Sequence, residues 1–417
     1  MKKMKKLPAI ILVLVMVFAL VACNGGKDDA STAGAGSSPA PAAGGDSSPA
    51  PAGNDSPSTA GGVGGQEQTT AEPERQEVSS GGVDHFARPA FKIAYICNTL
   101  TWAWNNALDQ TLTKLQPLMN IEYTGWSANF DFDAYINQIY VFKDMGYDGL
   151  ILGVDDSLAA RSYEVCKEAG IPAFVAESTA FMDESGLCIW PSVQQANYVN
   201  GVKCVEWLAD NYKTYWGEID TSTLGLIVLD FSTVSGIAER SPGAEDAFKR
   251  LFPEAADNYF YSDLLIFGTE GFSAQGGNDM AMSVFANNSQ IEHWFVVGNV
   301  DDWASGATRA AESLQMEDRV LVVSVQADAF LMEMGAGYSG NVYVAAAAIS
   351  STEFAIRMAE ALVKVLDGSE TPETLWPEWR DPGGQYPRYQ VSGEMITRDT
   401  YQQYLIDDAA LLTNYAG

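Results

Sequence analysis

The chain has 417 residues, of which 54 are acidic and 24 are basic, so its formal net charge at neutral pH is −30. Four lysines lie within the first six residues, and removing their charges takes the net charge from −30 to −34. This acidic balance argues against binding of nucleic acid or anionic lipid by the folded part. The two histidines, His85 and His293, form no metal-ligand motif, so we expect no transition-metal site and no cofactor.

The first 22 residues have the layout of a secretory signal peptide, with the lysines followed by an apolar run over 7–22. The alternative is an uncleaved transmembrane helix. Sixteen helical residues would span only about 24 Å, however, which is too short to cross a hydrocarbon core of roughly 30 Å. The run ends in Leu20-Val21-Ala22-Cys23, and this resembles the lipobox of bacterial lipoproteins. The resemblance implies that Cys23 is lipidated and anchors the protein to the outer face of the cell membrane.

Residues 23–88 consist mostly of Gly, Ala, Ser and Pro and cannot bury a core. We expect a disordered tether with a root-mean-square reach of roughly 45 Å over some sixty residues. The folded part would therefore stay near the membrane without lying against it.

From about residue 90 onward, short apolar runs alternate with segments of helical spacing. Glycines or a Gly-Ile-Pro entry bound several of the runs, which is typical of strands. In chain order the pattern predicts strands over 91–96, 149–153, 173–176, 224–229, 293–297 and 320–325, with helices over 104–119, 133–145, 157–169, 243–251 and 304–314.

This alternation predicts an α/β fold with two doubly wound parallel-sheet lobes, because about 330 residues exceed what one hydrophobic core usually serves. We place one lobe at 90–198 and 343–371, and the other at 199–342 and 372–417. The chain would then cross a three-segment hinge, and a ligand would bind in the cleft between the lobes. The remaining cysteines, Cys97, Cys166, Cys188 and Cys204, have no CxxC spacing; buried thiols are the favoured interpretation, with disulfides left open.

The segment 291–310 resembles the strand, ligand loop and helix of the type I periplasmic sugar-binding proteins, most closely those that bind L-arabinose. The segments 149–153, 170–172, 239–243 and 395–399 match further family landmarks in the expected order. The resemblance covers roughly residues 90–405. It implies a monomeric, non-enzymatic receptor that closes on a pentose or hexose and presents it to an ABC permease in the membrane.

In the first lobe, the resemblance places ligand-binding side chains after two strands. Asn98, Trp102 and Trp104 follow the first strand, and Trp104 matches the family position at which an aromatic ring lies against the ligand. Glu177 follows the strand at 173–176, where the family usually has an aspartate. Such aromatic and polar side chains suit a sugar, because its C–H faces need flat apolar surface and its hydroxyls need hydrogen bonds.

In the second lobe, Arg240 matches an arginine whose planar guanidinium forks around ring and hydroxyl oxygens in the family. Asn299 and Asp301 fall in the ligand loop, although the family's usual Asn-Asp pair is replaced here by Val300-Asp301. Gln326 and Asp328 follow the strand at 320–325 and would complete the ring of polar groups. These departures fall on positions that select the ligand.

Three alternatives remain to be weighed. Gly335–Gly340 satisfies GxGxxG, but a helical pattern precedes it and a strand follows, the reverse of a dinucleotide site. A glycosidase would need two carboxylates about 5 to 10 Å apart, which Glu177, Asp301 and Asp328 could supply by converging. The same fold could also serve as the ligand-binding subunit of a membrane kinase or chemoreceptor.

Overall fold

The computed structural model describes residues 78, 80, 82–153, 156–176, 182–183, 185 and 187–415. The predicted signal peptide, Cys23, nearly all of the predicted tether and Glu177 lie outside the described residues. Within the described part, no helix combines the length and the apolar character needed to cross a bilayer.

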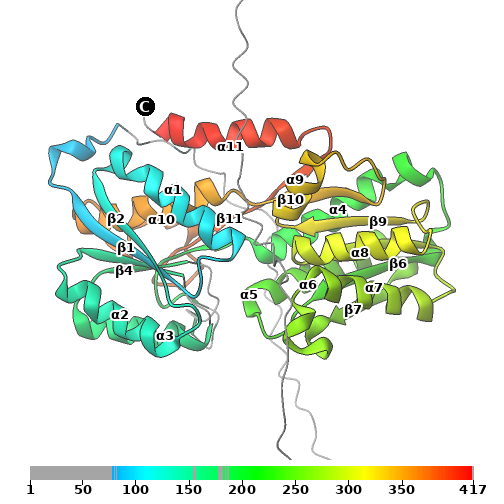
Figure 1. Ribbon diagram of the computed structural model, residues 1–417, viewed down its shortest axis with the longest axis horizontal. Helices are drawn as coiled ribbons and strands as arrows, with labels where there is room; N and C mark the ends of the chain where they lie inside the picture. The colour runs from blue at the N-terminus through cyan, green and yellow to red at the C-terminus, as the bar shows by residue number, and fades with distance from the viewer. Residues whose placement is uncertain are drawn as a thin grey trace, which may run out of the picture. The chain divides into compact units, whose positions relative to one another are not determined.

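The strands form two six-stranded sheets, one in each lobe of the fold (Figure 1). The first sheet is parallel throughout, in the order β11-β5-β4-β3-β1-β2. Its strands are β1 (Phe91–Cys97), β2 (Ile121–Ser127), β3 (Gly149–Gly153), β4 (Ala173–Ala176), β5 (Ser192–Gln195) and β11 (Arg388–Val391).

The second sheet repeats this order as β12-β10-β9-β8-β6-β7. It is parallel except for β12, which pairs with β10 in the antiparallel sense. Its strands are β6 (Leu224–Asp230), β7 (Tyr259–Asp263), β8 (His293–Gly298), β9 (Val320–Val325), β10 (Tyr343–Ala348) and β12 (Glu394–Thr397). The prediction of two doubly wound lobes is confirmed.

The chain passes between the sheets three times, after β5, between β10 and β11, and between β11 and β12. The predicted lobe boundaries differ from the strand pairing at two places. β10 belongs to the second sheet, because it pairs with β9, and β11 belongs to the first sheet, because it pairs with β5. β11 has only four residues and pairs with β5, a strand far earlier in the sequence, so local pattern could not assign it.

Helices cover both faces of each sheet. In the first lobe, α1 and α10 pack together on one face, and α2 packs with α3 on the other. In the second lobe, α4 packs with α6, and α7 packs with α8. The helices are α1 (Ala103–Met119), α2 (Phe132–Asp144), α3 (Asp156–Ala169), α4 (Asn197–Trp216), α5 (Ser235–Ala238), α6 (Arg240–Leu251), α7 (Ala274–Asn287), α8 (Asp301–Ser313), α9 (Asp328–Gly335), α10 (Ser351–Leu366) and α11 (Tyr401–Tyr415).

The central strands are apolar on both faces, as burial between two helical layers requires. In β6, Leu226 and Val228 point into the core beneath α4 and α6, whereas Ile227 and Leu229 point into the core beneath α7 and α8. This period of two follows from the pleat of the strand. Parallel strands with both faces buried have their C-terminal ends at one edge, and the loops at that edge carry most of the predicted site residues.

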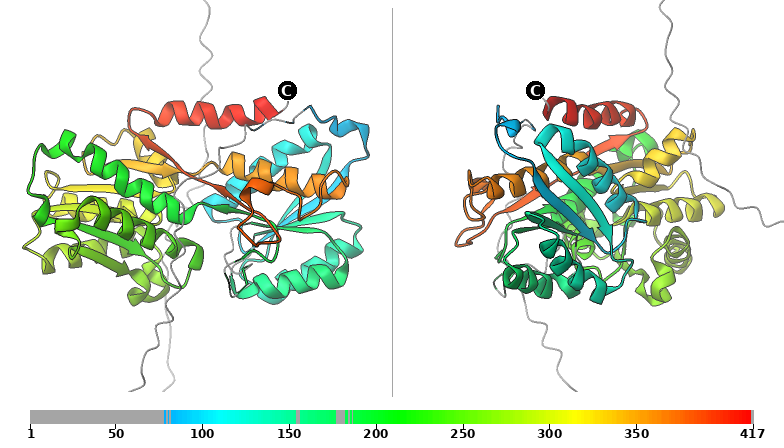
Figure 2. Two further views of the ribbon diagram at one scale, coloured as in Figure 1. Left: turned by 180° about the vertical axis from the view of Figure 1, so that it is seen from behind. Right: turned by 60° about the vertical axis from the view of Figure 1, so that its left-hand side comes forward.

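The last helix, α11, contacts elements of both lobes. It packs on α10 of the first lobe and on β12 of the second, and it is the red helix that runs along one side of both lobes in Figures 1 and 2. Asp408 of α11 accepts hydrogen bonds from Ser350 and Thr352, which lie where the chain leaves β10 and enters α10. The short 3₁₀ helices are η1 (His85–Ala87), η2 (Thr221–Thr223), η3 (Pro253–Ala255), η4 (Leu264–Gly271) and η5 (Pro377–Trp379).

The order of elements answers the alternative raised by the GxGxxG motif. The GxGxxG motif begins at Gly335, the last residue of α9, and ends before β10, so it lies in a helix-to-strand connection that a dinucleotide site does not use. Asp131 accepts a hydrogen bond from the amide of Ala134 and is the N-cap of α2.

Candidate functional site

Aromatic rings from both lobes meet at the C-terminal ends of the strands. Trp102 lies between β1 and α1, Phe130 follows β2, and Phe272 follows η4 in the second lobe. The Trp102 ring is 5.4 Å from that of Phe130, centroid to centroid, in an edge-to-face contact. It is 6.4 Å from the ring of Phe272, with only 17° between the two planes. The loops after β1 and β2 therefore face the loop after β7.

Two further rings support Phe272 from within the second lobe. Phe231, directly after β6, and Trp303, in the first turn of α8, have ring centroids 5.3 Å and 5.2 Å from that of Phe272. Phe231 and Trp303 are buried, whereas Trp102, Phe130 and Phe272 are 48%, 51% and 38% exposed. We call these five residues the aromatic cluster. It has a buried base in the second lobe and exposed rings from both lobes.

The backbone at Phe130 has an uncommon conformation. Asn129 and Phe130 have φ values of 51° and 62°, a left-handed region that bulky side chains seldom occupy. The loop is held by hydrogen bonds from the amide of Phe130 to the carbonyl of Asn98 and from the hydroxyl of Ser127 to Oδ1 of Asn129. Conformations of this kind persist only where surrounding bonds impose them, and they concentrate at functional sites.

Arg240, at the start of α6, is buried and hydrogen-bonded by protein groups. Its Nε donates to Oδ1 of Asn197 at 2.9 Å, and Nη2 donates to Oε1 of Gln195 at 2.5 Å. Nη1 donates to the backbone carbonyl of Asn299. Because Gln195 ends β5 and Asn197 begins α4, the guanidinium bridges the first crossing between the lobes.

Asn299 and Arg240 belong to one buried hydrogen-bonded group. The Nδ2 of Asn299 donates to the hydroxyl of Ser241, and this hydroxyl donates to Oδ2 of Asp230, the last residue of β6. The other carboxylate oxygen of Asp230 accepts from the amide of Phe231. We call this group the polar cluster; its members are Gln195, Asn197, Asp230, Arg240, Ser241 and Asn299.

Asp301, the first residue of α8, links that helix to α9 by a hydrogen bond. Its Oδ2 accepts a hydrogen bond of 2.5 Å from the amide of Ala329 in α9. The residue is only 5% exposed. Burial, and secondly the neighbouring carboxylate of Asp328, raise the pKa of Asp301 to about 7. Its carboxyl group therefore has a structural role beside any role toward a ligand.

The other predicted site residues occupy different settings. Trp104 packs into the core of the first lobe, with its ring 5.4 Å from that of Phe354 in α10, and it does not join the aromatic cluster. Asn98 is buried, Gln326 is half-buried with a φ of 70°, and Asp328 is exposed at the start of α9. Asn98, Gln326 and Asp328 all follow strand ends, as predicted.

Sequence reasoning found Trp102 but missed the other four rings of the aromatic cluster. Phe130 and Phe231 stand three residues and one residue after β2 and β6, so an aromatic residue just beyond a strand was the available signal. Trp303 and Phe272 carried no such signal. Trp303 is fully buried within α8, and Phe272 follows a 3₁₀ segment rather than a strand.

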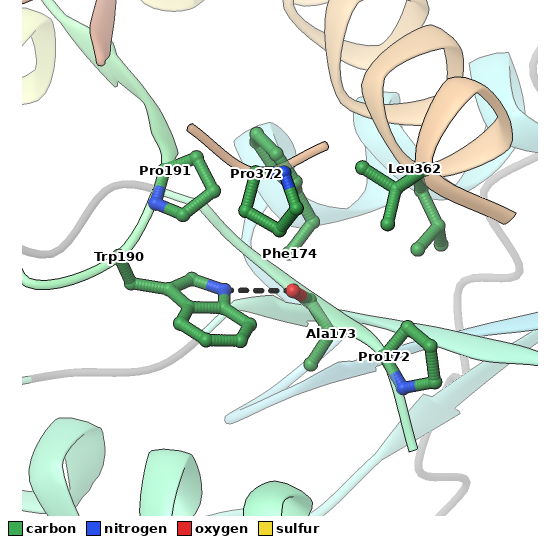
Figure 3. A pocket seen from close by; sticks show the side chains of 8 residues that line it. Pro172, Ala173, Phe174, Trp190, Pro191, Leu362 and Pro372 are labelled. Carbon is green, nitrogen blue, oxygen red and sulfur yellow. Dashed lines mark hydrogen bonds between the residues drawn. The ribbon is translucent and has the colours of Figure 1, made fainter. Parts of the chain in front are cut away.

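A separate cavity of about 200 Å³ lies away from these strand ends (Figure 3). Trp190 covers one side of it and donates a hydrogen bond of 2.7 Å from Nε1 to the carbonyl of Ala173, the first residue of β4. This is the N-terminal edge of a parallel sheet, whereas ligands of such sheets bind at the C-terminal edge. The lining residues are Pro172, Ala173, Phe174, Trp190, Pro191, Leu362, Val365 and Pro372.

The cysteines of the described residues form no disulfide. Cys97, Cys166, Cys188 and Cys204 are buried free thiols, and burial raises the pKa of Cys97 to about 12. Among the residues that the structure describes, no three His, Cys, Asp or Glu side chains are arranged to hold a metal ion.

Comparison with known proteins gives a likeness in structure alone. No protein-family model matches the chain. No curated protein sequence matches it either. Many solved structures do.

One is the periplasmic component of an arabinose ABC transporter from Shewanella sp. ANA-3, with bound α- and β-L-arabinofuranose. It is 15% identical, with a TM-score of 0.56 over 78% of this chain and 98% of that one. The 5-methylthioribose transporter solute-binding protein of Thermotoga lettingae TMO is 15% identical, with a TM-score of 0.57 over 79% of this chain and 95% of that one.

A periplasmic ribose ABC transporter protein from Conexibacter woesei DSM 14684 is 14% identical, with a TM-score of 0.59. The match covers 76% of this chain and 95% of that one. At such low identity the likeness establishes the fold, which is the two-lobed, doubly wound fold of type I periplasmic binding proteins.

Proposed function

We propose that this protein is an extracytoplasmic solute-binding protein that captures a small sugar between its lobes and delivers it to an ABC permease. The observation that carries the proposal is the meeting of exposed aromatic rings from both lobes, Trp102 and Phe272, at the C-terminal strand ends. Flat rings suit the C–H faces of a sugar, and parallel α/β sheets bind ligands at this edge. The solved structures of the same fold that are described above come from sugar transporters.

Delivery to a permease requires two distinguishable states of the receptor. Three crossings between the lobes favour bending about a hinge, and a ligand that contacts both lobes stabilises the closed state by its differential affinity. The lipid anchor at Cys23 and the tether belong to the same proposal, because they would keep the receptor near its membrane partner. We expect the receptor to act as a monomer and not as an enzyme.

The test is binding of free sugars to the purified folded chain. In a thermal-shift screen of L-arabinose, D-ribose, D-galactose, D-allose and myo-inositol, we expect at least one to stabilise the protein. A ligand present at a hundred times its dissociation constant contributes about 2.7 kcal/mol. Calorimetric titration of that sugar should give one site per chain, and mass spectrometry should recover the sugar unchanged.

The control variants are Trp102→Ala and Phe267→Ala. Phe267 in η4 is 38% exposed and stands outside the aromatic cluster, so its truncation should leave the affinity for the sugar unchanged. Trp102→Ala should weaken binding. Absence of stabilisation by every sugar would contradict the proposal, and hydrolysis of a glycoside would favour an enzyme instead.

A further inference from the structure

We propose that the ligand carries a planar aromatic group as well as a sugar, as a nucleoside does, and that Trp102 and Phe272 hold this planar group between them. The inference rests on the proposed function, because the sugar part would occupy the same strand-end region. It goes further by naming the chemical class of the ligand and the two side chains that select it.

The C-terminal strand ends leave three aromatic rings exposed to solvent. Trp102, Phe130 and Phe272 are each between 38% and 51% exposed, and they come from both lobes. Phe231 and Trp303 are buried and support Phe272 from within the second lobe. A sugar ring alone offers limited apolar surface, whereas three exposed aromatic rings suit a ligand with a flat apolar group.

The buried polar side chains at the strand ends are already hydrogen-bonded within the protein. All three nitrogens of the Arg240 guanidinium donate to protein acceptors, and Asp230 accepts from Ser241 and from the amide of Phe231. Asp301 accepts from the amide of Ala329. Since these groups are buried and bonded to one another, part of the hydrogen-bonding capacity that a polyhydroxylated sugar needs is already occupied.

The rings of Trp102 and Phe272 are nearly parallel and come from opposite lobes. The planes of Trp102 and Phe272 are within 17° of parallel, and their centroids are 6.4 Å apart. A flat group between two rings needs about 7 to 8 Å, because each carbon-to-carbon contact takes about 3.5 to 4.0 Å. A planar ring could therefore enter and contact both rings once the lobes open and the two rings move apart to lie face to face at this separation.

The loop that carries Phe130 has a strained backbone. The left-handed backbone at Asn129 and Phe130 places a half-exposed phenylalanine edge-on to Trp102. An exposed ring gains little for the fold, while its backbone conformation has a free-energy cost. The contact fixes the Trp102 ring in an orientation nearly parallel to Phe272, so we assign Phe130 a positioning role.

The experiment compares ligands that share a pentose and differ in the planar group. Calorimetric titrations of adenosine, uridine, D-ribose and L-arabinose are carried out on the full mature chain and on Phe272→Ala. The matched control is Phe267→Ala, which removes an equally exposed ring from the neighbouring η4 segment. Circular dichroism and thermal unfolding establish that each variant is folded.

We expect a nucleoside to bind more tightly than its free pentose. Phe272→Ala should weaken nucleoside binding about five- to 150-fold, the range set by stacking of one base on one aromatic side chain. It should affect free ribose less, and Phe267→Ala should change neither affinity. Phe130→Ala should weaken nucleoside binding to a smaller extent, and Phe130→Tyr should retain it.

Three outcomes would overturn the inference. Binding of free sugars with no binding of nucleosides would do so while leaving the proposed function intact. Equal losses for ribose and adenosine in Phe272→Ala would show that this ring contacts the sugar. Absence of binding by every sugar and every nucleoside to the folded chain would overturn the inference together with the proposed function.

Discussion

The aromatic cluster and the polar cluster occupy the same strand ends but differ in what they offer a ligand. Three of the five rings are about half-exposed, and two of those three belong to the first lobe. Arg240, Asp230 and Asn299 are at most 2% exposed and are bonded to one another or to their neighbours. The aromatic cluster therefore offers exposed apolar surface to a ligand, whereas the polar cluster stabilises the folded structure.

This difference bears on how a ligand site can be read from residue types. Arginine, asparagine and aspartate are the side chains expected to recognise hydroxyl groups, yet here their hydrogen bonds stabilise the first crossing between the lobes. A buried polar group must be hydrogen-bonded whether or not a ligand is present. The phenylalanine rings need no hydrogen-bond partner, and Trp102, Phe130 and Phe272 remain 48%, 51% and 38% exposed.

The largest effect should follow truncation of Arg240. Arg240→Ala would remove the hydrogen bonds that the guanidinium donates to the side-chain oxygens of Gln195 and Asn197, and it would open a cavity. We expect the free energy of unfolding in urea to fall by about 3 to 5 kcal/mol.

Arg250→Ala on the same helix is the matched control. Arg250 is exposed, and its ion pair with Glu206 at 2.7 Å lies at the surface, so its loss should change stability by about 1 kcal/mol or less. If Arg240→Ala lost sugar affinity with an unchanged free energy of unfolding, the guanidinium would belong to the ligand and not to the hinge.

The next effect concerns pH and the carboxyl group of Asp301. Its pKa of about 7 in the folded chain lies above the ordinary value of 3.8, so folding favours the protonated form. The stability from this group is fully present below pH 4 and is lost as the pH rises through 7. Asp301→Asn cannot ionise and keeps an oxygen for the amide of Ala329. It should therefore be more stable than the parent at pH 8, by at most roughly 4 kcal/mol.

Urea unfolding at pH 4, 6 and 8 checks this expectation. The difference between Asp301→Asn and the parent should vanish near pH 4 and grow toward pH 8. The exposed Asp328→Asn should have a smaller effect, because it only removes a negative charge near Asp301. A constant difference across the three pH values would show that Asp301 ionises normally.

The elements that sequence predicted best are those buried on both faces. β9 is an unbroken apolar run and was predicted at its observed bounds, because strands between two helical layers contain few polar residues. The edge strands β2 and β7 were not predicted. Their sequences, IEYTGWS and YFYSD, mix polar and aromatic residues, since an edge strand has one side open to water.

The site was harder to predict than the fold, for a physical reason. An aromatic residue after a strand can pack inward, as Trp104 does against Phe354, or remain open, as Trp102 does. Spacing in the sequence does not distinguish the two, because the choice depends on helix α10, some 250 residues away along the chain. One partner of Trp102 is Phe272, which lies in the other lobe and is also remote in sequence.

The smallest predicted effect tests the contact between the lobes directly. A double-mutant cycle with Trp102→Ala and Phe272→Ala, measured by urea unfolding without ligand, should give a coupling free energy of about 0.5 to 1.5 kcal/mol. The parallel cycle with Trp102→Ala and Phe267→Ala should give none beyond about 0.5 kcal/mol. Absence of coupling in both cycles would mean that the two rings contribute nothing to holding the free lobes together. The aromatic cluster would then act only through a ligand placed between them, whereas coupling already present in the free chain would make ligand entry compete with the ring contact.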